Sequence, residues 1–315
     1  MVPADRGPVY PLIRARRTIN IYMAIVRRAV ILAAGLGTRM LPATKAVPKE
    51  MLPIVDRPLI QYAVEEAVAA GIEEIVFVTA DGKESITEHF QSGGRIARAL
   101  AAREDLLGLA EAPARLAEFS AVRQARPRGI ADAVRCARPL VEGEPFALLF
   151  PDDLLLASTP VTGQLIDAYE CAPGSVIAVQ EVNEADIPQY GIVAPVATAK
   201  SGRLTRLSGI VEKPAPSEAP SRLGVVGRYV LSETIFDHIE RIAPGKNNEL
   251  QLTDALASQI AAGETVSAYR YEGDRYDTGR PAGFILAGVA AALERPDLCD
   301  TVRQRLEELL ARRPA

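Results

Sequence analysis

Residues 28–39 read RAVILAAGLGTR, and this stretch decides how the chain is expected to fold. Small and branched apolar residues fill Ala29–Ala33 without a polar interruption, as in a parallel strand that is buried on both faces. Gly35 and Gly37 follow at once, where a tight turn would lead the chain out of the sheet. Because ligands of open parallel sheets bind beyond the carboxyl ends of strands, this turn is the first candidate for a ligand site.

Outside this stretch, short apolar runs alternate with segments of helical period. Such an order is typical of βαβ units, whose crossovers are right-handed. We therefore predict an α/β fold with a Rossmann-like mixed, mostly parallel sheet flanked by helices. The expected strands are 29–33, 74–79, 119–124, 146–150, 176–180, 191–196, 204–211, 224–231 and 266–271, and the expected helices are 59–70, 85–90, 131–137, 233–241 and 252–262, with a helical insertion at 91–117.

Composition narrows the possible functions. Of 315 residues, 48% are hydrophobic and 24% charged, which suffices for a large core and argues against a disordered chain. The formal net charge of −4 argues against nucleic-acid partners, and no apolar run approaches the roughly 20 residues of a membrane span. The odd number of cysteines (Cys136, Cys171, Cys299) predicts reduced thiols in a cytoplasmic protein. His89 and His238 are the only histidines, which excludes a multi-histidine metal site.

The two ends of the chain differ in pattern from its central part. Residues 1–27 lack a sustained period, and we predict either a flexible N-terminal tail or a coding start nearer Met23. Ile19–Val26 is short for the core of a signal peptide and lacks a small-residue cleavage site, so secretion is not expected. From Asp300 onward, apolar residues recur at helical spacing, which predicts a C-terminal helix at 296–315. That helix could pack on its own domain or form a dimer contact.

The turn after the first strand is followed by residues suited to an anion. Thr38 adds a hydroxyl group, and Arg39 adds a permanent cation whose forked donors match phosphate. Lys45 and Lys49 lie in the long Pro-rich connection 41–62, and long connections are often functional. Three cations after such a turn favour a triphosphate ligand, with a simple tight turn and solvated lysines as the ordinary alternative. The third glycine of the dinucleotide fingerprint and the Gly-Lys-Ser/Thr step of the Walker pattern are missing, which argues against a dehydrogenase.

Two carboxylates lie near expected strand ends. Asp152 follows the buried run 146–150, and Asp277 follows the strand region 266–271. A carboxylate in such a place can hold a hard cation such as Mg²⁺ against phosphate oxygens, but it can equally be a turn or N-cap residue. Spacing alone cannot pair the two, because they are far apart in the sequence.

At this point a resemblance to a known family becomes specific. The run AVILAAGLGTRMLPATKAVPKEMLPIVDRPLIQY at 29–62 resembles the opening of bacterial UTP–glucose-1-phosphate uridylyltransferases, members of the sugar-nucleotide pyrophosphorylase family. Seven further blocks follow in the family's order, and the resemblance covers about 29–290. The blocks are VRQ at 122–124, FPD at 150–152, QYGIV at 189–193, VEKP at 211–214, VGRY at 226–229, LQLTD at 250–254 and DTG at 277–279.

The resemblance implies a nucleotidyltransferase domain of the glycosyltransferase-A-like kind at 28–295. Its nucleotide-binding part would span about 28–160, and a small β-rich sugar-binding part about 175–280. The implied reaction converts UTP and α-D-glucose 1-phosphate into UDP-glucose and pyrophosphate by Mg²⁺-assisted in-line attack. The resemblance also implies a homodimer or homotetramer.

Roles at the site are implied residue by residue from the matching positions. Asp152 and Asp277 would hold Mg²⁺. Glu212 would bind sugar hydroxyls and Lys213 the sugar phosphate, since a carboxylate can accept from two vicinal hydroxyls and an ammonium can neutralise a phosphate. The amide of Gln124 would recognise the N3–H and O4 edge of uracil. The implied catalytic residues are Arg39, Lys49, Asp152, Lys213 and Asp277, and the implied substrate-binding residues are Ala34, Gly35, Gly37, Thr38, Gln124, Gly129, Tyr190, Gly191, Glu212, Val226 and Gly227.

The chain departs from the family pattern in two places, which keeps alternatives open. The expected Gln-Gly and Gly-Leu-Gly-His-Ala are replaced by Gln124-Ala125 and by GIADA at 129–133, a form closer to some thymidylyltransferase and archaeal relatives. The loop 247–249 reads NNE in place of the more usual Gly-Asp-Glu. The alternatives are a glucose-1-phosphate thymidylyltransferase that uses dTTP and a non-catalytic regulatory paralogue that binds nucleotide sugars. The retained acidic residues and Lys213 speak against the second.

Overall fold

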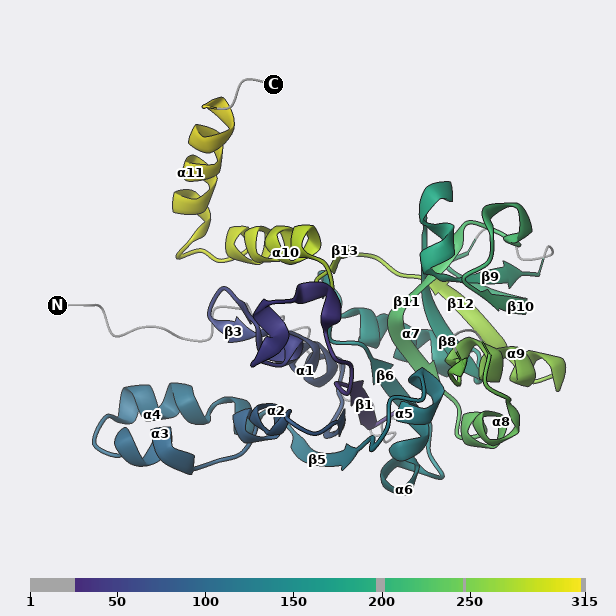
Figure 1. Ribbon diagram of the computed structural model, residues 1–315, viewed down its shortest axis with the longest axis horizontal. Helices are drawn as coiled ribbons and strands as arrows, with labels where there is room; N and C mark the ends of the chain where they lie inside the picture. Colours follow the sequence, from purple (N-terminus) through teal and green to yellow (C-terminus); the bar gives the residue numbers. More distant parts are fainter. Residues whose placement is uncertain (1–25, 197–201, 246–247, 313–315) are drawn as a thin grey trace.

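A nine-stranded mixed sheet forms the centre of the computed structural model, which describes residues 26–196, 202–245 and 248–312 (Figure 1). Its strands are β1 Arg28–Leu32, β4 Glu74–Thr79, β5 Glu118–Arg123, β6 Phe146–Leu149, β8 Ser175–Glu181, β9 Gly191–Pro195, β10 Leu204–Glu212, β11 Leu223–Leu231 and β12 Val266–Arg270. They lie in the order β5-β4-β1-β6-β11-β8-β12-β10-β9. Each expected strand is present, and no end differs from the expectation by more than one residue.

The direction of the strands changes across the sheet. β5, β4, β1 and β6 are mutually parallel, and β12 runs parallel to β8, whereas β11, β10 and β9 pair antiparallel with their neighbours. The prediction of a mixed sheet is confirmed, but "mostly parallel" is correct only for the first four strands. No α-helix is described between β8, β9, β10 and β11, and consecutive strands without a helical crossover pair antiparallel. β11 also runs antiparallel to β6, and β10 to β12, although helices lie between these strands in the chain.

Helices cover both faces of the sheet. One core cluster joins the sheet to α5, α8 and α9 through residues such as Val134, Ile235 and Leu256. The other joins it to α1 and α7 through residues such as Val64 and Leu165. Strand residues supply both clusters because β1 and its neighbours are buried on both faces, as their apolar runs predict. The helices are α1 Leu59–Ala69, α2 Glu84–His89, α5 Ile130–Cys136, α6 Arg138–Val141, α7 Val161–Cys171, α8 Ile235–Arg241 and α9 Leu252–Ala261.

A short hairpin, a second two-stranded sheet and a long helix complete the body and were not foreseen from the sequence. β2 (Pro53–Ile54) pairs with β3 (Arg57–Pro58), and β7 (Asp153–Leu156) pairs with β13 (Asp274–Asp277). The helix α10 (Pro281–Leu293) packs on both through a third core cluster. Because β7 starts directly after Asp152 and β13 ends at Asp277, this small sheet brings two sequence-distant acidic segments together.

Two helical segments extend from the body (Figure 1). The expected insertion forms α3 (Gly94–Ala99) and α4 (Glu104–Glu111), and neither helix has a buried residue. The expected C-terminal helix is α11 (Cys299–Ala311), which projects from α10 and has no buried residue. Because none of its residues is buried, α11 adds nothing to the core, and both packing on its own domain and a dimer contact stay predictions.

The start of the described chain belongs to the domain. Val26 is buried, and the Arg27 carbonyl accepts hydrogen bonds from the amides of Glu73 and Glu74. The tail expected at 1–27 otherwise lies outside the described residues, as does Asn247 of the departing loop. Within the described ranges, no helix is both long and apolar enough to cross a bilayer. The three cysteines are free, as expected.

Candidate active site

The turn after β1 is held against Lys49 by Gly37. Gly37 has a φ of +65°, and a Cβ atom there would lie 3.1 Å from the Cβ of Lys49. The Thr44 hydroxyl donates to the Gly37 carbonyl at 2.8 Å, which fixes the segment between them. A side chain at this position would strain the backbone and push the Lys49 segment away. Ala34, Gly35 and Thr38 lie on the same turn, where Ala34 is half-buried and the other two are exposed.

Lys49, Arg39 and Asp152 form the centre of the candidate site. Lys49 lies in the 3-10 turn η3 (Lys49–Met51), and Asp152 follows β6. The ammonium of Lys49 lies 2.6 Å from Oδ2 of Asp152, and the guanidinium of Arg39 lies 3.9 Å from the same oxygen. The long connection 41–62 thus brings two cations to the end of a buried strand. Lys45, the third expected cation, is exposed at the end of the turn η2 (Ala43–Lys45).

A buried ion pair supports Lys49 from behind. Glu50 is fully buried, and both of its carboxylate oxygens accept from the ammonium of Lys83, at 2.8 and 2.9 Å. Lys83 precedes α2, so the pair ties η3 to the segment after β4. Burial raises the pKa of the Glu50 carboxyl and lowers the pKa of the Lys83 ammonium. Because loss of either partner would leave a buried unpaired charge, the pair fixes the turn that carries Lys49.

Charge around Asp152 keeps this carboxylate ionised. Burial by itself would raise the pKa of Asp152, but Lys49 and Arg39 outweigh burial and leave the pKa below its ordinary value. Burial likewise opposes the charged form of Lys49, and Asp152 with Glu50 reverses that effect and raises the pKa of Lys49. The two groups therefore remain oppositely charged at neutral pH.

Asp277 lies beside Asp152 because β7 and β13 pair. Asp277 is opposite Asp153 in the register, and both the amide and the hydroxyl of Thr278 donate to the Asp152 carbonyl, at 2.9 and 2.8 Å. A Cβ at Gly279 would lie 2.7 Å from the Arg39 guanidinium and 3.0 Å from Oδ1 of Asp277, so Arg39 also reaches this segment. The structure brings together the two aspartates that the sequence could not pair.

Asp153 is a site residue that the sequence analysis missed. Its Oδ1 accepts from the guanidinium of Arg275, whose NH1 donates to the Tyr190 hydroxyl at 2.9 Å. Its Oδ2 accepts from the Gly227 amide at 2.8 Å. Burial raises the pKa of Asp153, opposite to the shift at Asp152. Asp153 directly follows the quoted FPD block, and this adjacency was the only signal of its role.

Glu212, Lys213, Tyr190 and Gly191 meet where β9 pairs with β10. Lys213 has a φ of +46°, its amide donates to the Tyr190 carbonyl, and its ammonium lies 3.0 Å from Glu212. The other carboxylate oxygen of Glu212 accepts from the Thr253 hydroxyl at 3.0 Å. A Cβ at Gly191 would lie 2.8 Å from Thr253 and 3.3 Å from Glu212. The expected sugar-side residues therefore form one cluster, to which Thr253 of the LQLTD block also belongs.

Val226 and Gly227 lie at an irregularity of β11. The pairing of β11 with β8 shifts register between Val225 and Tyr229, as at a β-bulge. The Val226 side chain is buried in the core, so only its backbone could face a ligand. At Gly227 a Cβ would lie 2.6 Å from Phe150, which explains the glycine.

Arg228 holds the loop that carries Asp152. This fully buried arginine pairs with Glu66 of α1 at 2.7 Å and donates to the carbonyls of Phe150, Gly227 and Asp153. The loop after β6 is thus fixed from β11 and α1 together.

Gln124 and Gly129 lie on the loop between β5 and α5. Gln124 is buried, and its amide nitrogen donates to Asp132 at 2.8 Å and to the Gly129 carbonyl at 3.2 Å. Gly129 has a φ of +107°, and a Cβ there would lie 2.5 Å from the Leu250 carbonyl. The amide of Ala131 donates to that same carbonyl. The LQLTD block therefore bridges the Gln124 loop and the Glu212 cluster.

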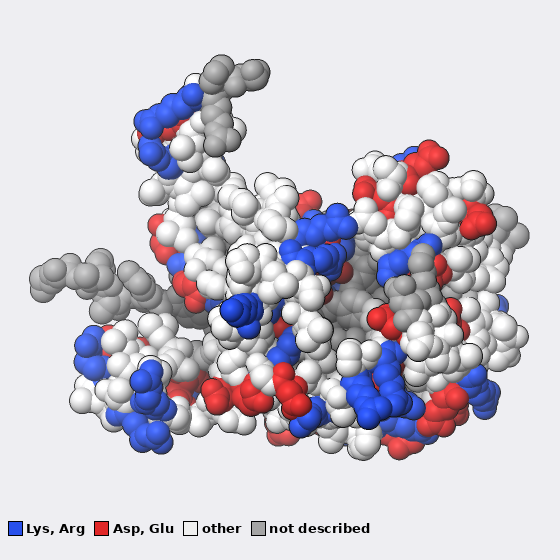
Figure 2. Space-filling model, in the orientation of Figure 1, with Lys and Arg blue, Asp and Glu red and all other residues white. Residues whose placement is uncertain are grey.

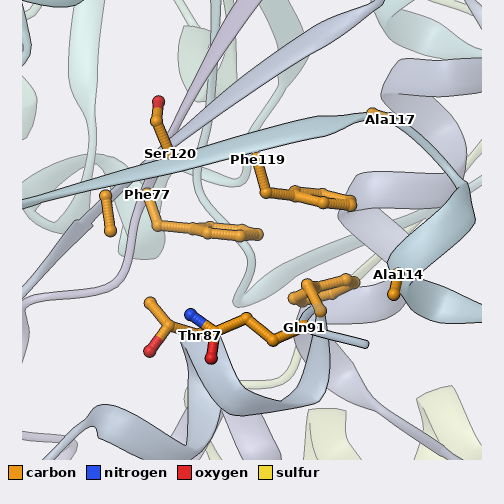
Figure 3. Close-up of a pocket in the computed structure, with 9 residues that line it drawn as sticks. Phe77, Thr87, Gln91, Ala114, Ala117, Phe119 and Ser120 are labelled. Atoms are coloured by element: carbon orange, nitrogen blue, oxygen red, sulfur yellow. The ribbon is translucent and has the colours of Figure 1, made fainter. Parts of the chain in front are cut away.

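Two pockets lie apart from Lys49, Arg39 and Asp152. One, of about 220 Å³, has no charged lining residue and lies where the rings of Phe77, Phe90 and Phe119 stack (Figure 3). Another, of about 310 Å³, is lined by arginines next to Gln124. The molecular surface is hollowed between the part with β1 and α1 and the part with β9 and β10, and Lys and Arg lie on the rim (Figure 2). Neither pocket is lined by Arg39, Lys49 or Asp152.

The donor set suits a particular kind of metal. Among the described residues, no group of three or more His, Cys, Asp or Glu could hold an ion. Mg²⁺ does not need such a cage, because it commonly uses one or two carboxylates and completes its shell with substrate phosphates and water. Asp152 and Asp277 supply two such carboxylates on adjacent segments, because Thr278 beside Asp277 donates to the Asp152 carbonyl and Asp277 pairs with Asp153.

Comparison with known proteins agrees with this geometry. The nucleotidyl transferase family model matches residues 28–292. A UTP–glucose-1-phosphate uridylyltransferase of Bacillus subtilis is 44% identical over 290 residues, covering 91% of this chain and 98% of the relative. Among solved structures, the UTP-bound UGPase from Acinetobacter baumannii has a TM-score of 0.80 at 38% identity, covering 90% of this chain and 99% of that one. A UDP-glucose pyrophosphorylase complexed with UDP-glucose has a TM-score of 0.76 at 37% identity, covering 86% and 100%.

The fold is a mixed β-sheet between two layers of helices, with cations on the turn after its first strand and two aspartates near strand ends. This arrangement suits a transferase that acts on phosphate groups. The chain belongs to the nucleotidyl transferase family. The resemblance seen in the sequence motifs is thereby confirmed.

Proposed function

We propose that this chain transfers the uridylyl group of UTP to α-D-glucose 1-phosphate, forming UDP-glucose and pyrophosphate. The observation that carries the proposal is the convergence of Arg39 and Lys49 on Asp152. Asp277 lies on the adjacent segment, where the next residue, Thr278, donates to the Asp152 carbonyl. Two anionic reactants repel each other, and only a site with fixed cations brings them together. Curated relatives at 43–44% identity over 91% of the chain have this activity in their names.

The chemistry needs no enzyme nucleophile. An oxygen of the sugar phosphate attacks the α-phosphorus of UTP in line, the bond to the β-phosphate oxygen breaks, and pyrophosphate leaves from the opposite side. Arg39 and Lys49 hold the triphosphate and offset charge on the leaving group, and Lys213 neutralises the attacking phosphate. Positioning and charge stabilisation of this kind account for most of the catalysis in phosphoryl transfer.

Asp152 and Asp277 are the residues that would hold Mg²⁺. Bound there, the ion would neutralise phosphate charge between the reactants. The Lys49 ammonium now lies on Oδ2 of Asp152, so in the complex the lysine would turn toward phosphate oxygens while Asp152 takes the ion.

The remaining assignments concern recognition. Glu212 accepts from sugar hydroxyls beside Tyr190 and the backbone of Val226 and Gly227. Gln124 recognises the base, and the turn formed by Ala34, Gly35, Gly37 and Thr38 offers backbone amides to the phosphates, with Gly129 completing the base side. The protein acts in the cytoplasm as a homodimer or homotetramer. Because uracil and thymine share the N3–H and O4 edge, dTTP is the second candidate nucleotide.

A substrate matrix with one matched pair of variants tests the proposal. Purified protein with Mg²⁺ should release pyrophosphate from UTP and glucose 1-phosphate, and less from dTTP. Asp152→Asn should lower kcat at least about 100-fold, the size expected for loss of one preorganised charge interaction. Asp300→Asn, an exposed carboxylate at the start of α11, serves as the control and should retain full activity. An active Asp152→Asn variant would refute the assigned role.

A further inference from the structure

We propose that Asp132 is a positioning residue that fixes which atom of the Gln124 amide faces the nucleotide base, and that it thereby selects bases with a ring N–H, such as uracil. The inference rests on the proposed function, because it takes Gln124 to lie against the base. Asp132 stands where the resembling family has histidine, so the family pattern does not assign this role.

The orientation of the Gln124 amide follows from the chemistry of its partners. Its nitrogen lies 2.8 Å from Oδ2 of Asp132 and 3.2 Å from the Gly129 carbonyl oxygen. An ionised carboxylate and a carbonyl can only accept hydrogen bonds, so the group facing them must be the NH₂ group. The usual uncertainty between the oxygen and nitrogen of a glutamine amide therefore does not arise here.

Asp132 is itself held in place. It lies buried in the first turn of α5, and its Oδ1 accepts from the guanidinium of Arg135 one turn later. Arginine has donors but no acceptor. Oδ1 is thus committed to Arg135 and Oδ2 to Gln124, which leaves the glutamine amide a single orientation.

The free atom of Gln124 is its carbonyl oxygen. No described residue donates to Oε1, and no buried side-chain nitrogen or oxygen in the described ranges lacks a partner, so Oε1 is open to solvent. Gln124 consequently presents an acceptor and no donor. Uracil and thymine offer N3–H to an acceptor, whereas the N3 of cytosine is itself an acceptor and would meet Oε1 unfavourably.

Substituting Asp132 by asparagine should release this orientation. In Asp132→Asn, Arg135 still requires an oxygen, so the new NH₂ group faces Gln124 and favours Oε1 as its partner. The Gln124 nitrogen is then held only by the Gly129 carbonyl, the longer of its two hydrogen bonds at 3.2 Å, so the amide can turn and its nitrogen can donate to the N3 of cytosine. We expect the ratio of kcat/KM for UTP to that for CTP to fall about tenfold or more, the size of one mismatched hydrogen bond.

The neighbouring arginine provides matched controls. Arg135→Gln leaves the Asp132 carboxylate as an acceptor, so the UTP/CTP ratio should stay within about twofold of the wild type. In the double variant Asp132→Asn/Arg135→Gln, no guanidinium holds the asparagine oxygen away from Gln124. That oxygen can then accept from the Gln124 nitrogen again, and part of the preference for UTP should return. A merely structural role of Asp132 predicts similar losses with UTP and CTP, hence an unchanged ratio in Asp132→Asn, and that result would overturn the proposal.

A binding measurement separates this proposal from the proposed function. Calorimetry with UMP and CMP on the wild-type chain should show at least about tenfold tighter binding of UMP, and equal binding overturns the proposal even where Asp132→Asn does not fold. Preferential UMP binding without pyrophosphate release from UTP and glucose 1-phosphate refutes the proposed function and leaves the role of Asp132 supported. Turnover with an unchanged ratio in a folded Asp132→Asn variant refutes the role of Asp132 alone.

Discussion

Asp152 and Asp153 are adjacent in sequence but have opposite electrostatic surroundings. Lys49 and Arg39 flank the Asp152 carboxylate, whereas Arg275 and the Gly227 amide bond Asp153. The pKa of Asp152 is lowered from its ordinary value and that of Asp153 is raised, chiefly by burial. The first carboxylate is thus held in the charged form by its cations, whereas the second joins β7 to Arg275 of β13 and to the Gly227 amide of β11.

Lys49→Met tests the charge balance at Asp152. A buried carboxylate without its ammonium partner costs about 3 kcal/mol of unfolding free energy at neutral pH. In the wild type the pKa of Asp152 is lowered, so the pair contributes stability above the ordinary value of 3.8 and loses it as the pH falls below that. In the variant the pKa of Asp152 rises, and protonation relieves the unpaired charge. The difference in unfolding free energy between the wild type and Lys49→Met, here called the stability gap, should therefore be constant from about pH 7 to 9 and become smaller toward about pH 4.

Urea unfolding at several pH values measures this gap. Lys45→Met is the matched control, because Lys45 is exposed in the same connection. It should change stability by no more than about 0.5 kcal/mol at any pH. A gap for Lys49→Met that does not depend on pH anywhere in this range would contradict the charge balance described here.

Residues at strand ends were predictable, and residues that act through them were not. Lys49, Arg39 and Asp152 follow a recognisable turn and strand, so sequence pattern and family resemblance identify them. Arg275 and Thr253 act only through contacts with residues distant in the sequence, Asp153 and Glu212. No local pattern encodes such contacts.

At the level of elements, β9, β10 and α9 meet at a contact that only glycine permits. Gly191→Ala would place a Cβ 2.8 Å from Thr253 and 3.3 Å from Glu212, displacing the carboxylate assigned to the sugar hydroxyls. We expect the KM for glucose 1-phosphate to rise about tenfold with the KM for UTP unchanged, alongside a loss of about 1–3 kcal/mol in stability from overpacking. Steady-state kinetics with each substrate varied in turn measures the difference.

Gly209→Ala is the control for this variant. Gly209 lies on β10, and its nearest neighbour would be the Ala194 side chain at 3.8 Å, an ordinary contact. Neither KM should change. A Gly191→Ala variant that raised both KM values equally would argue against a separate sugar side.

Element prediction succeeded where the hydrophobic period was long. Every strand of the main sheet was expected, most of them from an apolar run such as AVIL in β1 and FALL in β6. The two small sheets were missed because β2 and β3 have two residues each and β7 and β13 have four, too few for a period to be recognised. Helix α7 begins VTGQ, with a glycine and β-branched residues that weaken the helical signal.

At the scale of the whole molecule, α11 is the element least explained by the chain alone. None of its described residues is buried, and Leu309 and Leu310 are exposed. A helix of 13 residues is marginal in water without tertiary support. This favours the dimer interpretation of the C-terminal helix over packing on its own domain.

Removal of residues 299–315 tests that interpretation. Sedimentation velocity should show the full chain as an oligomer and the shortened chain as a smaller species. The melting temperature at low protein concentration should change little, because no core residue is lost. An unchanged oligomer after truncation would place the subunit contact elsewhere.

The order Asp152-Asp153 has one more consequence. Asp152 lies in the turn before β7 and Asp153 begins β7, so two neighbouring residues serve different contacts. Lys49 and Arg39 lie at the first carboxylate, whereas Arg275, which also reaches Tyr190, holds the second. One short segment therefore joins the turn after β1 to the start of β9, and a displacement of this segment would disturb both sets of contacts.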